Sequence, residues 1–313
     1  MIVHSLFFFY ITMSEMKTYQ IIIIIIVLLF IVINVKYNLK VNNQLTILQL
    51  NNPSKNILEE NLNIKSPTVI TNCMNNWEDL RLFSPDELSK VKVSVDLKLN
   101  TTISEQQKTD LVVTSSKEFF KWLLANKDKE PSQKFYLSEN DQLLKDFNLY
   151  QQFHKFANYY LSPMSVGKSY PVWIGCTGTK TGIHWDPEYR NIICQLYGTK
   201  KVYLFSPEQS KYMYPSDKYD NGGVVSSVDF WNIDQKKFPD FNQAQFMEII
   251  LHPGQMLFIP KYWWHACENM TTCVSIGIRS YIMSDFITGF PNACCFIGHK
   301  LGIYKKNNCT CHN

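Results

Sequence analysis

Residues 172–207 decide the fold expected for this chain, and they read VWIGCTGTKTGIHWDPEYRNIICQLYGTKKVYLFSP. The stretch contains short apolar-rich runs, at 192–196 and 201–205, separated by turns that contain glycine or proline. Runs of this length between Gly and Pro are typical of β-strands. Further runs of the same kind follow at 246–251, 255–259 and 273–279. Several short strands at close spacing indicate a mainly β domain, a sandwich or jelly roll.

The part of the chain before this stretch predicts a mixed α and β extension. Residues 67–71 and the alternating residues 91–99 are strand candidates. Ser84, followed by Pro85 and then Glu87, is the expected start of a helix. Residues 116–125 carry apolar side chains at helical spacing, with Ser116 as the expected N-cap.

Three side chains in the later strands form a candidate metal site. The segment TGIHWDP (181–187) contains His184 and Asp186 two residues apart. Residues two apart on a strand share a face, so both side chains can hold one side of an ion. His265 in IPKYWWH (259–265) supplies a third ligand from further along the chain. Two imidazoles and one carboxylate form the facial triad that suits Fe(II) and leaves coordination positions open.

Three longer segments resemble the JmjC domain of the cupin-like hydroxylases, a family that includes an asparaginyl hydroxylase of hypoxia-inducible factor and a tRNA wybutosine hydroxylase. They are FYLSEN (135–140), the stretch 172–207 quoted above, and LHPGQMLFIPKYWWHACEN (251–269). A weaker likeness begins at PTVITNCMNNW (67–77), so the resemblance covers about two-thirds of the chain. It implies a double-stranded β-helix with Fe(II) on His184, Asp186 and His265.

The resemblance also implies a site for 2-oxoglutarate as cosubstrate. Lys200 stands where the family has a lysine that pairs with the distal carboxylate, and a buried dianion does require a charged donor. Thr181 and Tyr136 stand where relatives supply hydroxyl groups to the same carboxylate. Asn191 lies near a family asparagine that holds the other end of the cosubstrate, although it comes one residue later than usual. Gly277, in VSIGIR, stands where the asparaginyl hydroxylase carries an asparagine.

The function expected from these residues is that of an Fe(II)- and 2-oxoglutarate-dependent dioxygenase, which consumes O₂ and hydroxylates a protein side chain. A JmjC demethylase, a tRNA hydroxylase and a non-catalytic cupin binding module are the alternatives. The formal net charge of +4 is spread along the chain, so nucleic acid is not indicated as a partner. The substrate and a homodimer are left open.

The amino-terminal end predicts a membrane anchor. Residues 21–33 are uninterruptedly apolar, and with flanking residues the segment 19–37 would be ~28 Å long as a helix. That length nearly matches a hydrocarbon core of ~30 Å, so an uncleaved single-pass transmembrane helix is expected, with a cleaved signal peptide as the alternative. The expected organisation is an amino-terminal segment (1–18), the anchor (19–37), a polar linker (38–65), the JmjC/cupin-like domain (66–285, with its iron-binding core at 172–281) and a Cys-rich tail (286–313).

The side of the membrane on which the domain lies is expected to be lumenal, by a small margin. Lysines on both sides of the apolar run weakly favour the cytosolic side. Three Asn-x-Ser/Thr sequons favour the lumenal side; they are at Asn100, Asn269 and Asn308. The tail carries Cys294, Cys295, Cys309 and Cys311, for which disulfides, a zinc site and inert thiols remain open.

Overall fold

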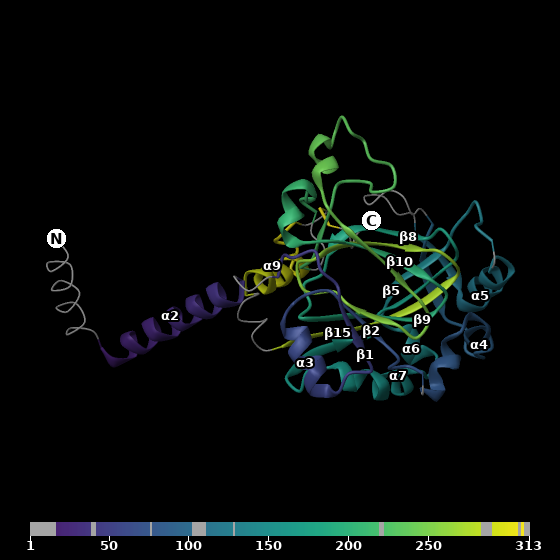
Figure 1. Cartoon of the computed structure of the whole chain (residues 1–313), viewed down its shortest axis with the longest axis horizontal. Helices are drawn as coiled ribbons and strands as arrows, with labels where there is room; N and C mark the ends of the chain where they lie inside the picture. The colour runs from purple at the N-terminus through teal and green to yellow at the C-terminus, as the bar shows by residue number, and fades with distance from the viewer. Residues whose placement is uncertain are drawn as a thin grey trace.

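The computed structural model describes residues 17–38, 42–75, 77–101, 111–127, 129–218, 222–282, 290–305 and 308–309, without the side chains of 33–38 and 290–293. Two β-sheets form the body of the protein (Figure 1). The larger sheet has the order β1 (Leu48–Asn51), β2 (Thr68–Thr71), β13 (Met256–Phe258), β9 (Arg190–Tyr197), β15 (Cys273–Ile282), β7 (Val172–Gly175), β5 (Tyr136–Asn140), β3 (Asp96–Asn100) and β4 (Leu111–Ser115), with β6 (Ser165–Ser169) beside β15. The smaller sheet has the order β11 (Val224–Val225), β8 (Lys180–Trp185), β14 (Trp264–Asn269), β10 (Lys200–Phe205) and β12 (Met247–Leu251). The mainly β jelly-roll fold expected from the sequence is confirmed.

Short helices cover the outer face of the larger sheet (Figure 1). They are α3 (Lys55–Asn63), α4 (Pro85–Ser89), α5 (Ser116–Ala125), α6 (Leu143–Asp146), α7 (Tyr150–Ala157) and the 3-10 helices η1 (Glu78–Phe83) and η2 (Asn158–Tyr160). Two further 3-10 helices, η3 (Pro207–Tyr212) and η4 (Pro239–Gln243), lie in the long connection after β10. Side chains at every second position of β15, such as Ile276 and Ile278, are buried against these helices. The intervening positions, including Gly277 and Arg279, therefore face the smaller sheet.

Local sequence signals located some elements well and others only in part. Ser84 caps α4 by accepting a hydrogen bond from the backbone N–H of Glu87, as predicted. The N-cap of α5 is Ser115 rather than Ser116, and Ser116 is buried within the helix. The strand expected at 91–99 begins only at Asp96, where burial starts to alternate. Val91 and Val95 instead pack against the helical side of the core.

Part of the segment expected as a polar linker is folded onto the body. Within 38–65, β1 pairs in parallel with β2, and α3 buries Leu58 and Leu62 completely or nearly so. These two leucines are four residues apart and so share one face of the helix. The Asn-rich composition of the segment conceals this narrow apolar face.

The predicted transmembrane anchor is wrong. A helix does occupy this region, α2 (Thr18–Asn38), and it projects from the body in Figure 1. Over the ranges that the structure describes, however, no helix is long and apolar enough to cross a membrane. A spanning helix needs roughly 20 consecutive apolar residues, whereas the uninterrupted run ends at Ile33 after 13. The expected single-pass membrane localisation is corrected together with the anchor, and the segment 1–16 lies outside the described residues.

The fold also weakens the case for a lumenal domain. Asn269, in one of the three sequons, is 2% exposed and donates a hydrogen bond to the backbone oxygen of Gly175, so a glycan cannot be attached there without unfolding. In the tail, Cys294 and Cys295 lie on α9 (Phe290–Lys300) as free thiols, and Cys309 is buried. Cys311 lies outside the described residues.

Candidate metal and cosubstrate site

The three predicted metal ligands meet between the two sheets. His184 lies on β8, Asp186 follows the end of that strand, and His265 lies on β14. The pairing of β8 with β14 places His184 and His265 directly opposite each other, and their ring centroids are 4.2 Å apart. One potential ligand atom from each of the three residues lies within 4.8 Å of the others. The site is therefore built by strand register and needs no loop rearrangement.

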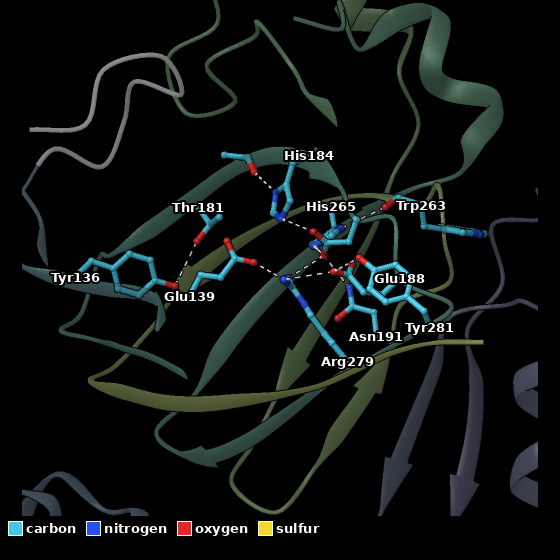
Figure 2. Close-up of polar contacts among 12 residues, drawn as sticks. Tyr136, Glu139, Thr181, His184, Glu188, Asn191, Trp263, His265, Arg279 and Tyr281 are labelled. Carbon is cyan, nitrogen blue, oxygen red and sulfur yellow. Dashed lines mark hydrogen bonds and ion pairs between the residues drawn. The ribbon is translucent and has the colours of Figure 1, made fainter. Parts of the chain in front are cut away.

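Backbone carbonyl groups orient both imidazoles (Figure 2). The Nδ1 atom of His184 is 2.9 Å from the oxygen of Gly182, and that of His265 is 3.2 Å from the oxygen of Trp263. This contact places the proton on Nδ1 and directs the Nε2 lone pair of each ring toward Asp186, at 3.8 Å and 3.4 Å. Hydrogen bonding of the distal ring nitrogen in this way is the usual support for histidine ligands of metals.

The electrostatics of the triad suit a cation. Burial by itself would raise the pKa of the Asp186 carboxyl, but Arg279 and the two imidazoles outweigh it and hold that pKa well below its usual range. Burial lowers the pKa of His265, and the neighbouring His184 lowers it further, although Asp186 opposes both effects. The carboxylate is therefore charged and the His265 imidazole neutral at physiological pH, which are the forms that bind a metal ion. This donor set fits Fe(II).

One oxygen of Asp186 is occupied by donors from the larger sheet. Its Oδ2 accepts hydrogen bonds from the Asn191 amide at 2.7 Å and from Arg279 Nη2 at 3.2 Å. Asn191 on β9 and Arg279 on β15 are direct register partners, so both donors arise from one place in the sheet. The other oxygen, Oδ1, is left for an ion.

The predicted cosubstrate residues line the same cavity. Lys200, the first residue of β10, is 3% exposed, and its ammonium group makes no hydrogen bond or ion pair with any residue in the described ranges. The phenol of Tyr136 lies 3.3 Å from the hydroxyl of Thr181. Burial raises the pKa of Tyr136, so this phenol stays protonated and can donate a hydrogen bond. The cavity thus has a cation and hydroxyl groups on one side and the triad on the other.

All seven residues singled out from the sequence, Tyr136, Thr181, His184, Asp186, Asn191, Lys200 and His265, line this cavity. Sequence reasoning missed Arg279 and Trp173, which line it too. A signal for Arg279 was present, because it is a charged residue in an otherwise apolar run at a central strand. Trp173 carried no signal of its own among the apolar residues 172–175.

Comparison with known proteins agrees with this geometry. Residues 54–281 match the family model described as the cupin-like domain. The chain belongs to this family. Human HSPB1-associated protein 1 is 37% identical over 121 residues, which are 38% of this chain and 25% of that protein. Lysine-specific demethylase JMJ30 of Arabidopsis thaliana is 31% identical over 219 residues, 68% of this chain and 49% of that protein. Lysine-specific demethylase 8 of Xenopus tropicalis is 38% identical over 105 residues, 34% of this chain and 23% of that protein.

The cupin-like domain is thus shared with proteins of JmjC type, and the resemblance inferred from the sequence motifs is confirmed. The matches cover about a quarter to a half of these relatives' length.

A buried carboxyl beside the triad predicts a pH-dependent stability. Glu188 is 8% exposed and accepts a hydrogen bond from the Tyr281 hydroxyl at 3.1 Å. Burial raises its pKa to about 7; Arg279 opposes this shift and Asp186 adds to it. The folded protein thus binds this proton more tightly than the unfolded chain, whose glutamates titrate near 4.3. Its stabilising contribution is complete below that value and is lost as pH rises to about 7.

In the metal-free protein, Glu188→Gln should therefore change stability little at pH 5. At pH 8 it should raise the free energy of unfolding by about 1–3 kcal/mol, because an amide carries no charge to desolvate. Urea unfolding at both pH values measures this difference. Glu78→Gln, at an exposed position, is the matched control. An equal effect of Glu188→Gln at pH 5 and pH 8 would contradict the assignment.

Proposed function

We propose that this cupin-like protein is an Fe(II)- and 2-oxoglutarate-dependent oxygenase that hydroxylates a protein side chain. The observation that carries the proposal is Lys200, a buried residue that lines the cavity of the triad and whose ammonium group has no hydrogen-bond or ion-pair partner in the described part of the chain. A buried charge without a partner is costly, so its presence points to an anionic ligand that completes the site. A dicarboxylic 2-oxo acid fits, because one end can reach Lys200 while the other reaches the ion.

The residues of the chain divide the work between binding and orientation. His184, Asp186 and His265 would hold Fe(II), which with 2-oxoglutarate and O₂ supplies the oxidising power for attack on a C–H bond. Lys200 and the hydroxyl groups of Tyr136 and Thr181 would bind the distal carboxylate. The backbone oxygens of Gly182 and Trp263 keep the imidazole rings in place. The buried position of the cavity limits the access of water to the reacting groups.

Demethylation of lysine is the second candidate, because two of the relatives named above are called lysine-specific demethylases. The two reactions share the same oxidative step and differ in the carbon attacked. A hydroxylated side chain retains the added oxygen, whereas a hydroxylated N-methyl group leaves as formaldehyde. The name of another relative describes association with a protein, HSPB1, which supports a protein partner for this chain.

Conversion of 2-oxoglutarate to succinate tests the proposal. Protein stripped of metal with a chelator should produce no succinate, and addition of Fe(II) in air should restore turnover. Zn(II) is the matched control, because it accepts the same ligands but has no redox chemistry. Succinate production that is independent of Fe(II) would contradict the proposal. Peptide substrates then distinguish the two reactions by a mass gain of one oxygen or by release of formaldehyde.

A further inference from the structure

At Gly277, β15 has no side chain on its inner face. A Cβ atom built at this position would lie 2.9 Å from Cγ of Pro171 and 3.1 Å from ring atoms of Trp173. The indole of Trp173 therefore occupies the space that a side chain at 277 would fill. The strand offers no amide donor to the cavity at this point, unlike the asparagine that stands here in the asparaginyl hydroxylase.

The same indole supports Arg279, the next residue along β15 on that face. The guanidinium carbon of Arg279 lies 5.3 Å from the ring centroid of Trp173, a cation–π distance. Gly277, Trp173 and Arg279 thus form one unit: the missing side chain admits the indole, and the indole orients the guanidinium. Figure 2 shows the guanidinium between Glu139 and Glu188.

Arg279 has hydrogen-bonding capacity that its present partners do not use. Its Nη2 donates to Asp186 at 3.2 Å, Nη1 donates to Glu139, and Glu188 lies 4.0 Å away. The Nε–H group is buried without a hydrogen-bond partner in the described ranges, although a guanidinium carries five N–H donors. The Glu139 side chain is 55% exposed, so it can exchange Arg279 for water at little cost. The contact between Arg279 and Asp186 cannot be exchanged for contacts with water in the same way, because these side chains are only 9% and 13% exposed.

Asn191, the other donor to Asp186, already uses its amide nitrogen for that contact. Its amide nitrogen donates to Asp186 Oδ2 at 2.7 Å, so this group orients the carboxylate ligand. An acid group that shares an ion with Asp186 would come within reach of the guanidinium that contacts Asp186. Among the described cavity residues, Arg279 is therefore the donor in contact with Asp186 that has capacity to spare.

We propose that Arg279 is the second cationic contact for the cosubstrate and binds the carboxylate next to its 2-oxo group, while Lys200 binds the distal carboxylate. This assignment rests on the proposed function. It gives the cavity two cationic groups, one for each carboxylate of a 2-oxo dicarboxylic acid. Glu139 is then a competitor that holds Arg279 until the acid arrives.

Truncated ligands test the assignment, because each lacks one of the groups in question. 2-Oxobutyrate has the 2-oxo acid group but no distal carboxylate, whereas 4-oxopentanoate has the oxo group and the distal carboxylate but no carboxylate next to the oxo group. Dissociation constants are measured by calorimetry on protein saturated with Mn(II), which binds without turnover. Arg279→Gln should weaken the binding of both 2-oxoglutarate and 2-oxobutyrate by the same factor, about 10- to 100-fold, and should leave the binding of 4-oxopentanoate nearly unchanged. Lys200→Met should weaken the binding of 2-oxoglutarate and 4-oxopentanoate but leave the binding of 2-oxobutyrate unchanged.

Glu139→Gln is the matched variant on the opposite side of Arg279. It removes the competitor, so 2-oxobutyrate should bind about 2- to 5-fold more tightly, in line with the loss of a partly exposed ion pair. If Arg279→Gln does not fold, Arg279→Lys keeps the charge but loses the fork of donors and should still weaken 2-oxobutyrate several-fold.

Three results would overturn the assignment. Unchanged binding of 2-oxobutyrate by Arg279→Gln at saturating Mn(II) would make Arg279 a support for Asp186 alone. A loss that disappears as the Mn(II) concentration is raised would have the same meaning, because the variant would then be deficient in metal. Failure of the unaltered protein to bind any 2-oxo acid would instead refute the proposed function, and the assignment with it.

Discussion

Replacing Asp186 by alanine should abolish both stoichiometric binding of Fe(II) and the conversion of 2-oxoglutarate, with turnover reduced by more than about 1,000-fold. Asp186 is the only anionic member of the described His-Asp-His group. Without it, the two imidazoles alone must hold a divalent cation beside the Arg279 guanidinium, which lies 3.2 Å from the present carboxylate. Repulsion between that guanidinium and the ion would add to the loss of a ligand.

Two variants separate this effect from unfolding. Asp186→Asn keeps an oxygen acceptor for Asn191 and Arg279 but removes the charge, so it should retain more of the fold while still losing the metal. Asp240→Ala, at an exposed position in η4, is the control for a surface carboxylate. Metal content per chain, thermal unfolding and succinate production are measured on all three. Normal iron content in a folded Asp186→Ala protein would remove the triad as the metal site.

The parts of the site that the sequence predicted are those set by local geometry. His184 and Asp186 are two residues apart, so one strand direction is enough to place them together. His265 was only a candidate until the resemblance to a known family supported it, and Lys200 came from that resemblance alone. The approach of both residues to His184 depends on the pairing of β14 with β8 and β10. No spacing in the chain encodes that register.

The contact between Arg279 and Asp186 was beyond prediction for a similar reason. It depends on the register that sets Arg279 opposite Asn191, and on the fit of Trp173 against a bare Gly277. From the sequence, Gly277 was only a departure from a motif. In the folded protein it is the space that admits the indole and, through it, orients the guanidinium.

In the amino-terminal region, two predictions made from average composition were wrong. Polar, Asn-rich residues predicted a linker where α3 buries Leu58 and Leu62, since only one narrow face of a short helix has to be apolar. The Ile-rich run predicted a membrane helix by including polar flanking residues in its length. In both cases the average hydrophobicity of a sequence window concealed where the apolar residues lie within it.

Lys200→Met should change stability and ligand binding in opposite directions. Lys200 as a whole is 3% exposed and its ammonium group has no hydrogen-bond or ion-pair partner in the described residues, so its removal should raise the free energy of unfolding by about 1–3 kcal/mol. The same change should weaken 2-oxoglutarate by about 100-fold or more, because the distal carboxylate would then be buried without a cation. If Lys200 destabilises the ligand-free protein and stabilises the complex with 2-oxoglutarate, its presence in the core is explained by ligand binding and not by folding.

The neighbouring lysine gives a matched control for this prediction. Lys201 points to the opposite face of β10, where it lies 3.4 Å from Glu248 with a quarter of its side chain exposed. Lys201→Met should therefore leave 2-oxoglutarate binding unchanged and shift stability by no more than about 1 kcal/mol. Thermal unfolding and calorimetric titration with 2-oxoglutarate, both in the presence of Mn(II), compare the two variants. If Lys200→Met lowered stability as well as affinity, Lys200 would be a structural cation with a partner in the free protein, and the dicarboxylate would lose its distal anchor.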